Sequence, residues 1–150
     1  ACTFWSTRVE SESIVYGCIR DWPSDRADER RLRRDTNRQV LASLPSGEAW
    51  PFLGREMFSC CETAGEGLYQ TQVIHFGASY RALEYEWPLW VEQFETLLKR
   101  LYWASAVVHL DTELKGCHTF RWESERGFHS PAEDDLRVRC VWERESGLRG

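Results

Sequence analysis

The sequence predicts an α+β fold, an antiparallel sheet of about five or six strands with two main helices on one face. Two observations support this prediction. Residues 86–103 have the apolar spacing of a helix, and residues 25–43 form a second helical segment that is rich in charge. The other segments are short runs of β-favouring residues, and short links join the last of them, as in antiparallel sheets. At 150 residues the chain has the length of one domain, residues 1–150.

The strongest helical signal predicts a core helix over about 88–102. Its apolar residues follow the spacing i, i+4, i+7, i+8, i+11 and are Trp90, Phe94, Leu97, Leu98 and Leu101. Pro88 suits the first turn, and we expect Trp87 before it to lie outside the helical region. Burial of the five side chains contributes on the order of 8–15 kcal/mol before entropy, at roughly 1.5–3 kcal/mol each.

The segments before this helix are expected in the following order. Two strands over 3–10 and 13–20 precede a helix over about 25–43 with Ser24 as its N-cap. Its thin apolar stripe consists of Leu32, Val40, Leu41 and Leu44, and Glu29–Arg33 and Arg31–Asp35 are pairs at i, i+4. A loop over 45–67 contains one helical turn near 54–58, a strand over 68–76 ends at 77–79, and a strand resumes over 80–85.

After the core helix we predict a hairpin with strands over 104–112 and 117–125. Gly116 is expected to take the left-handed turn position. A polar loop over 127–135 leads to a last strand over 136–143, and residues 146–150 are expected to fray.

Composition and charge narrow the class of partner. A hydrophobic content of 42% and a charged content of 29% are typical of a folded soluble protein. Residues 45–98 contain two bases and eight acids, a balance of −6, which would repel nucleic acid and attract a basic partner. The run RRLRR at 30–34 could contact nucleic acid, but the acids around it favour a solvated helix face with ion pairs. No apolar run approaches the roughly 20 residues of a membrane span, so no membrane partner is expected.

The six cysteines and the N-terminal residues predict a cytoplasmic location. The cysteines form no CxxC, and Cys60 and Cys61 are adjacent, where an intrachain bridge would be strained. Reduced thiols that serve as small core residues are the simplest interpretation. No basic region followed by an apolar run begins the chain, so no signal peptide is expected.

One group of residues could carry chemistry. If the hairpin loop is 113–116, Asp111 lies opposite His118 and His109 lies opposite Phe120, with Glu113 on the same face. Two imidazoles and two carboxylates could hold a metal (His109, Asp111, His118) or act as an acid–base pair in a small hydrolase. A register shift of one residue would separate them. GxSxG, GxGxxG, GxxxxGK[ST] and HExxH are absent, so no catalytic residue and no cofactor is assigned.

A second pattern predicts binding of a protein partner. Eight tryptophans are many for this length, and several alternate with acids. Aromatic anchors surrounded by acids suit a protein that binds and blocks a basic partner. The residues assigned to this surface are Glu84, Glu86, Trp87, Trp90, Glu113, Trp122, Glu123 and Glu125. The alternative is that each Trp packs in the core while each Glu keeps the surface soluble.

Residues 73–122, VIHFGASY…EWPLWVEQFETLLKRLYWASAVVHLDTELKGCHTFRW, resemble small bacterial proteins. In size, acidity and lack of a catalytic motif the chain is similar to the immunity proteins encoded beside secreted polymorphic toxins. The resemblance implies a cytoplasmic, non-enzymatic protein that binds one cognate toxin domain and occludes its active site. Such toxins are nucleases, deaminases or ADP-ribosyltransferases, and the resemblance does not choose among them or imply particular binding residues.

Overall fold

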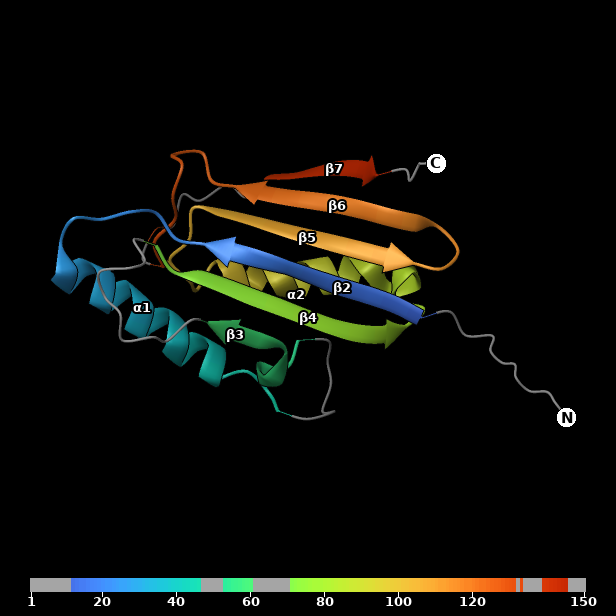
Figure 1. Cartoon of the computed structure of the whole chain (residues 1–150), viewed down its shortest axis with the longest axis horizontal. Coiled ribbons are helices and arrows are strands. Elements are labelled where there is room, and N and C mark those ends of the chain that lie inside the picture. Colours follow the sequence, from blue (N-terminus) through green and yellow to red (C-terminus); the bar gives the residue numbers. More distant parts are fainter. Residues whose placement is uncertain (1–11, 47–52, 61–70, 132, 134–138, 146–150) are drawn as a thin grey trace, which may run out of the picture.

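Six strands form one antiparallel sheet in the computed structural model, which describes residues 12–46, 53–60, 71–131, 133 and 139–145, with the backbone alone at 84 and 139–145. The strand order is β3-β4-β2-β5-β6-β7, so β2 and β5 occupy the centre (Figure 1). The strands are β2 Glu12–Arg20, β3 Phe58–Cys60, β4 Val73–Arg81, β5 Ser105–Thr112, β6 Gly116–Glu123 and β7 Arg139–Glu145. The predicted strand over 3–10 lies outside the described residues.

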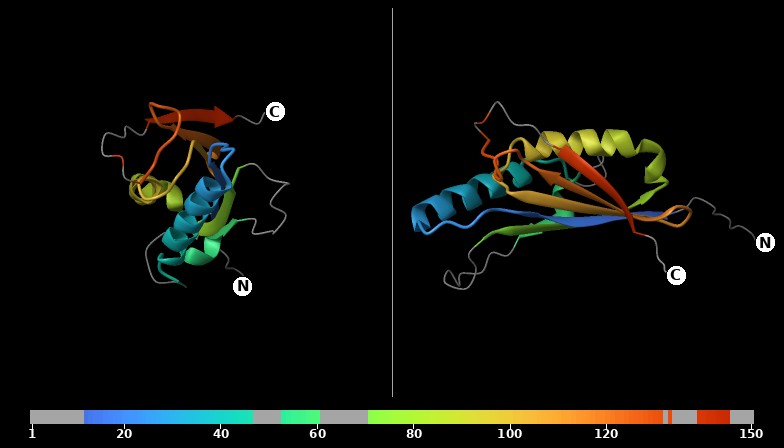
Figure 2. Two further views of the ribbon diagram at one scale, coloured as in Figure 1. Left: turned by 90° about the vertical axis from the view of Figure 1, so that its left-hand side faces the viewer. Right: turned by 90° about the horizontal axis from the view of Figure 1, so that it is seen from above.

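Two helices lie on the same face of this sheet. They are α1 Ala27–Ala42 and α2 Trp87–Leu98, and two short 3₁₀ turns are η1 Arg55–Met57 and η2 Leu83–Glu86. In Figure 2 both helices are on one side of the strands, and no described helix covers the other side. The predicted α+β class is therefore confirmed. Within the described part of the chain, no helix has the length and apolar character that crossing a membrane requires.

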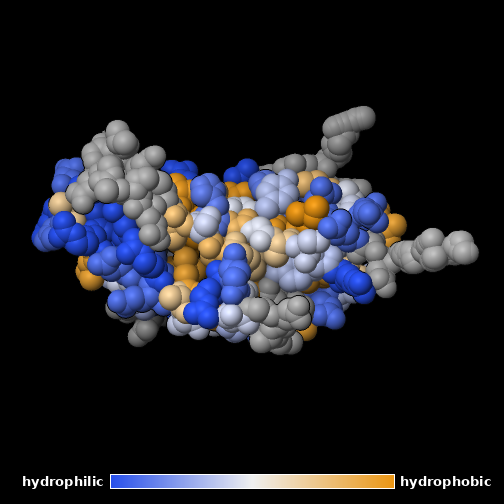
Figure 3. All heavy atoms as spheres, turned by 60° about the horizontal axis from the view of Figure 1, so that its bottom comes forward, coloured by the Kyte–Doolittle hydropathy of each residue, from blue (hydrophilic) through white to orange (hydrophobic). Residues whose placement is uncertain are grey.

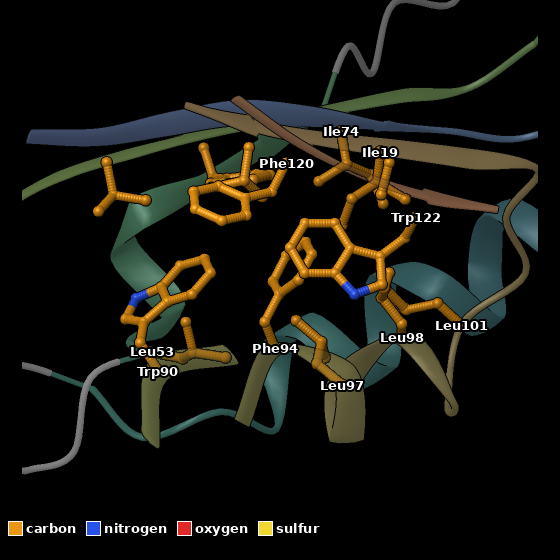
Figure 4. Packing of buried hydrophobic residues seen from close by; sticks show 14 of the residues in the cluster. Ile19, Leu53, Ile74, Trp90, Phe94, Leu97, Leu98, Leu101, Phe120 and Trp122 are labelled. Carbon is orange, nitrogen blue, oxygen red and sulfur yellow. The ribbon is translucent and has the colours of Figure 1, made fainter. Parts of the chain in front are cut away.

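The core lies between α2 and the sheet. All five apolar residues of the predicted stripe, from Trp90 to Leu101, are at most 2% exposed, as predicted. Figure 4 shows them directed toward side chains of the strands, among them Ile19, Ile74, Phe120 and Trp122. Phe94 lies at the centre, with its ring 5.0 Å from the Trp122 ring. The helical spacing therefore placed this part of the core correctly, because one face of α2 supplies four of the eighteen buried core side chains among the described residues.

Both ends of α2 differ from the prediction. Trp87 has φ −57° and ψ −41°, which is helical, because its indole stacks on Trp90 at 4.9 Å and this packing outweighs the bias before proline. The helix ends at Leu98 instead of 102. The chain turns away there because the Tyr102 N–H donates to Asn37 Oδ1 at 2.8 Å, and Trp103 pairs with His129.

α1 packs mainly through polar side chains. Of its predicted apolar stripe, Leu41 is buried but Leu32 is 56% exposed. Asn37 is fully buried and donates to Gln72 Oε1 and to the Tyr102 carbonyl, each at 3.0 Å. The helix also begins later than predicted, with Arg26 as the N-cap, because the Ser24 hydroxyl accepts the Arg26 N–H in a turn before it.

Arg33 is the charged side chain that anchors the start of α1. It is 2% exposed and donates to Asp21 at 3.0 Å, to Glu29 at 3.0 Å and to the Trp22 carbonyl at 2.8 Å. The Glu29–Arg33 pair is as predicted, whereas Asp35 pairs with Arg38. Burial raises the pKa of Asp21, although the Trp22 N–H and the Arg33 guanidinium both lower it. One arginine of the RRLRR run is therefore structural rather than solvated.

Three strand predictions need correction. β4 continues through residues 77–79 to Arg81, because β2 pairs with it along its whole length and Gly77 opposes Tyr16 in the ladder. No strand resumes over 80–85; Ala82 takes a left-handed conformation, φ 52°, and η2 follows. The short edge strand β3 lies inside the region predicted as loop, directly after the predicted helical turn near 54–58, which is confirmed as η1.

Candidate functional site

The hairpin of β5 and β6 forms with a register one residue away from the expected one. Asp111 lies opposite Cys117 and His109 opposite Thr119, while His118 opposes the buried Leu110. The turn has three residues rather than four, because Thr112 Oγ1 accepts the Lys115 N–H at 2.9 Å and Gly116 adopts φ +80°. The left-handed Gly116 is as predicted, and the register is not.

This register separates the residues proposed for metal or acid–base chemistry. His109 and Asp111 are on the face of the sheet away from the helices, whereas His118 is on the core face. His109 Nδ1 lies 2.9 Å from Thr119 Oγ1, and His118 Nε2 lies 3.1 Å from the Lys115 carbonyl. Within the described ranges, no group of three His, Cys, Asp or Glu side chains is placed to hold a metal ion. The prediction that His109, Asp111, Glu113 and His118 form a cluster is therefore wrong, because it required the register in which Asp111 lies opposite His118.

The residues assigned to partner binding divide into buried and exposed ones. Trp90 and Trp122 are fully buried, so the expectation that these two rings contact a partner is wrong. Trp122 donates instead to Glu95 Oε2 at 2.7 Å, which joins β6 to α2. Trp87 is half-buried. Four of the assigned acids are exposed, namely Glu86, Glu113, Glu123 and Glu125, and the backbone of Glu84 lies in η2.

The exposed acids lie at two opposite ends of the sheet. Glu113 is in the turn before β6, and Glu123 is the last residue of β6. A strand rises about 3.3 Å per residue, so the eight residues of β6 separate these acids by roughly 25 Å. α2, which begins directly after Glu86, starts at the end of the sheet where the turn between β5 and β6 lies (Figures 1 and 2). The predicted surface is therefore two surfaces, and Glu123 and Glu125 belong to the second.

The end with the β5–β6 turn exposes large apolar side chains beside its acids. Tyr85 is 69% exposed, Leu89 48% and Leu114 69%. Together with Glu86 and Glu113 they form what we call the hairpin-end surface. Tyr85 belongs to η2, Leu89 to the first turn of α2, and Leu114 to the turn between β5 and β6. These three residues are half of the six large apolar side chains that are exposed in the described structure.

Trp87 connects this surface to the core. Its indole lies 4.9 Å from the Trp90 ring at 6°, and 5.0 Å from the Phe120 ring of β6. The start of α2 is thereby held against the strand that follows the turn. Trp87 Nε1 is buried and has no hydrogen-bond partner among the described residues, an unmet donor of a kind that costs about 1–3 kcal/mol.

Three members of the hairpin-end surface, Tyr85, Leu89 and Leu114, are absent from the residues assigned from the sequence, although the two leucines each carry a signal. Leu89 lies outside the apolar stripe of its helix, and Leu114 is an apolar residue in an otherwise polar turn, TELKG. An apolar side chain off the buried face of an amphipathic helix, or at the tip of a hairpin, has no core to enter. Both positions therefore indicate an exposed apolar contact.

The described part of the molecule also has an apolar cavity and a charged helix end. The cavity, of about 250 Å³, lies between the end of α1 and α2, and its lining residues are Leu44, Pro45, Leu53, Gln93, Thr96, Leu97 and Arg100. Its described lining supplies apolar contact and one guanidinium, which donates to Ser43 Oγ at 3.0 Å. Strongly hydrophilic residues gather at the end of the molecule where α1 begins (Figure 3).

Comparison with protein-family models, with curated proteins and with solved structures found no match for this chain.

Proposed function

We propose that this protein binds a basic partner protein through the hairpin-end surface and acts by occupying that partner's active site. The exposure of Tyr85, Leu89 and Leu114 beside Glu86 and Glu113 is the observation that carries the proposal. Single apolar side chains at a surface are ordinary. Three at one end, with an aromatic ring among them and acids beside them, have the composition of a binding site for another protein.

The charges of this end support a basic partner. By the strand register, Glu12 and Asp111 lie at the same end as Glu86 and Glu113, and among the side chains that the structure describes the bases there are Arg81 and Lys115. Four acids against two bases favour encounter with a positively charged surface. The whole chain carries a net charge of −5, which adds to the same field.

The firm support under the surface favours tight binding. Trp87 stacks between the surface and the core rings Trp90 and Phe120, so the start of α2 is held in place before any partner arrives. A surface that is already ordered loses less conformational entropy on association. A stoichiometric inhibitor needs this property, because it must remain bound to its target.

The finer form of the proposal is an immunity protein. Its target is a cognate secreted bacterial toxin domain, a nuclease, deaminase or ADP-ribosyltransferase, whose active site is basic because it binds phosphate groups. The carboxylates of the hairpin-end surface take the place of those phosphates. Inhibition then involves no chemistry by the immunity protein and no cofactor, and it takes place in the cytoplasm.

Co-expression with the toxin domain of the neighbouring gene tests the proposal. The toxin should be lethal alone and tolerated together with this protein, and the purified pair should form a one-to-one complex. The variants Tyr85→Lys and Leu89→Lys should each weaken binding by roughly 30-fold or more, as expected for the loss of a hot spot of about 2 kcal/mol.

Leu32→Lys is the matched control, because Leu32 is an apolar residue of α1 that is 56% exposed and lies away from the hairpin end. It should bind and protect like the wild type. Survival that does not depend on the protein would contradict the immunity function. Protection that persists in both Tyr85→Lys and Leu89→Lys would contradict the choice of surface.

A further inference from the structure

The face of the sheet opposite the helices has an apolar, aromatic centre. Figure 2 shows both helices on the other side of the strands. Where one face of an antiparallel sheet meets only water, its side chains are normally polar. Here the two central strands place on the open face Ile14, Tyr16, Cys18, Val107 and His109. Ile14 is 41% exposed and Tyr16 43%.

The centre of this open face is also ordered. The Tyr16 ring stacks on the His109 ring at 4.8 Å and 29°. His109 Nδ1 lies 2.9 Å from the hydroxyl of Thr119, which is fully buried although it belongs to the open face. The aromatic pair is thus fixed in orientation by a neighbouring strand, as in a surface prepared for contact.

The charges on the open face are separated along the strands. Arg20 lies opposite Ser105 and Ile14 lies opposite Asp111, so Arg20 and Asp111 are at opposite ends of β2 and β5. Six residues along β5 correspond to roughly 20 Å. The acidic end carries Glu12 and Asp111 with Arg81, and the basic end carries Arg20 and Arg121 with Glu123. Among the side chains that the structure describes, the balance of charge is −1 at one end and +1 at the other.

We propose that a second copy of this chain packs on the open face, so that two sheets form a sandwich. Rotation by 180° about an axis in the plane of the face and perpendicular to the strands lays the Asp111 end of one copy on the Arg20 end of its partner. This arrangement buries Tyr16 against the equivalent centre and pairs Asp111 with the partner's Arg20 twice, because a two-fold interface is self-complementary. The other in-plane axis would place like charges together.

The size of the face agrees with such a dimer. The 44 residues of the six strands, at about 3.3 Å per residue and about 4.8 Å between strands, cover roughly 700 Å², close to the roughly 800 Å² that each partner contributes to a stable interface. Facing sheets pack about 10 Å apart with strands within about 30° of each other. Because the face carries both signs of charge, it suits its own copy better than the basic partner of the hairpin-end surface, which stays accessible in the dimer.

Measurement of mass in solution tests the proposal, by sedimentation velocity and light scattering over a concentration series. The wild type should form a dimer of about 35 kDa, twice the 17.6 kDa of one chain. Tyr16→Glu should raise the dissociation constant by at least roughly 100-fold, because it places an unpaired carboxylate at the centre of the interface. Arg20→Glu and Asp111→Arg should each raise it by roughly tenfold, more at low than at high salt.

The double variant Arg20→Glu/Asp111→Arg should recover the dimer, because both partners of each pair are then reversed. Leu32→Glu is the control, since it adds the same charge at an exposed apolar residue of α1, and it should remain dimeric. Circular dichroism establishes that each variant is folded. A wild type that is monomeric throughout, a folded Tyr16→Glu that dimerises normally, or a double variant weaker than both single ones would each overturn the proposal. Because the mass is measured on this protein alone, the outcome does not depend on whether a toxin binds at the hairpin-end surface.

Discussion

Replacement of Arg33 by alanine should destabilise the protein severely, although it removes one of four arginines in a run that suggests a solvated helix. Arg33 is 2% exposed, and Asp21, at 3.0 Å from Nε, is 6% exposed. Without the guanidinium, the Asp21 carboxylate keeps the Trp22 N–H at 2.7 Å but loses its counter-charge in a buried site. Loss of one partner from a buried ion pair costs about 3–5 kcal/mol. The total free energy of unfolding of most domains is only about 5–15 kcal/mol.

Urea unfolding followed by tryptophan fluorescence measures this loss. With a slope of about 2 kcal/mol per M, the midpoint should fall by about 2 M at an unchanged slope. Asp21→Asn removes the charge that would be stranded, so Arg33→Ala/Asp21→Asn should be less destabilised than the sum of the two single variants by at least about 1 kcal/mol.

Arg31→Ala is the matched control, because Arg31 is an exposed arginine of the same helix turn and should change stability by no more than about 0.5 kcal/mol. If Arg33→Ala is as stable as Arg31→Ala, the buried network does not hold α1 in place. If the double variant equals the sum of the single ones, Arg33 acts through packing alone and the electrostatic reasoning fails.

Three further predictions concern the core. Gly17→Ala should cost at least about 1–3 kcal/mol, because a Cβ would lie 2.0 Å from the Val107 carbonyl oxygen; a urea midpoint equal to that of the wild type would contradict this contact. Burial raises the pKa of Tyr80 above its ordinary 10.0, while the Trp90 Nε1–H lowers it, so the folded state holds the phenolic proton more tightly. Stability should therefore fall as pH rises above about 10, and Tyr80→Phe should show a shallower fall in the same titration; identical slopes would count against the buried phenol. Trp122→Phe should cost about 1–3 kcal/mol through the lost bond to Glu95 and a small cavity, yet leave toxin affinity unchanged, since its ring is fully buried; a loss of affinity in a folded variant would show that Trp122 reaches the partner.

The candidate site was predictable only in part. Glu86, Trp87 and Glu113 were predictable as exposed or half-exposed residues, because a residue at a helix start or in a hairpin turn is near the surface in any packing. The burial of Trp90 and Trp122 was not predictable, since an indole beside an acid in the sequence is equally suited to a surface anchor and to a core residue. The choice depends on what lies across from it, which for Trp122 is Phe94 and Glu95 on another element.

The hairpin of β5 and β6 also has features that local sequence preferences predict and one that they do not, its register. Its strands and the left-handed Gly116 follow from local preferences, since β-favouring runs flank a residue without a side chain. Its register goes with a three-residue turn, in which the Lys115 N–H donates to Thr112 Oγ1, and this register places His118 on the core face. That small change separates the residues of the cluster predicted for metal or acid–base chemistry.

The sequence by itself determined the α+β class, the buried stripe of α2 and the approximate positions of β2, β5 and β6, because helical and strand periodicity are set by neighbours within a few residues. Only the tertiary structure decided that Arg33 and Asn37 are buried, which tryptophans are buried, and which face of the sheet the helices leave uncovered. Asn37, for example, is held by Tyr102, 65 residues away. A polar side chain can be buried only where distant groups meet its hydrogen bonds, and no local pattern records which groups the fold will bring there.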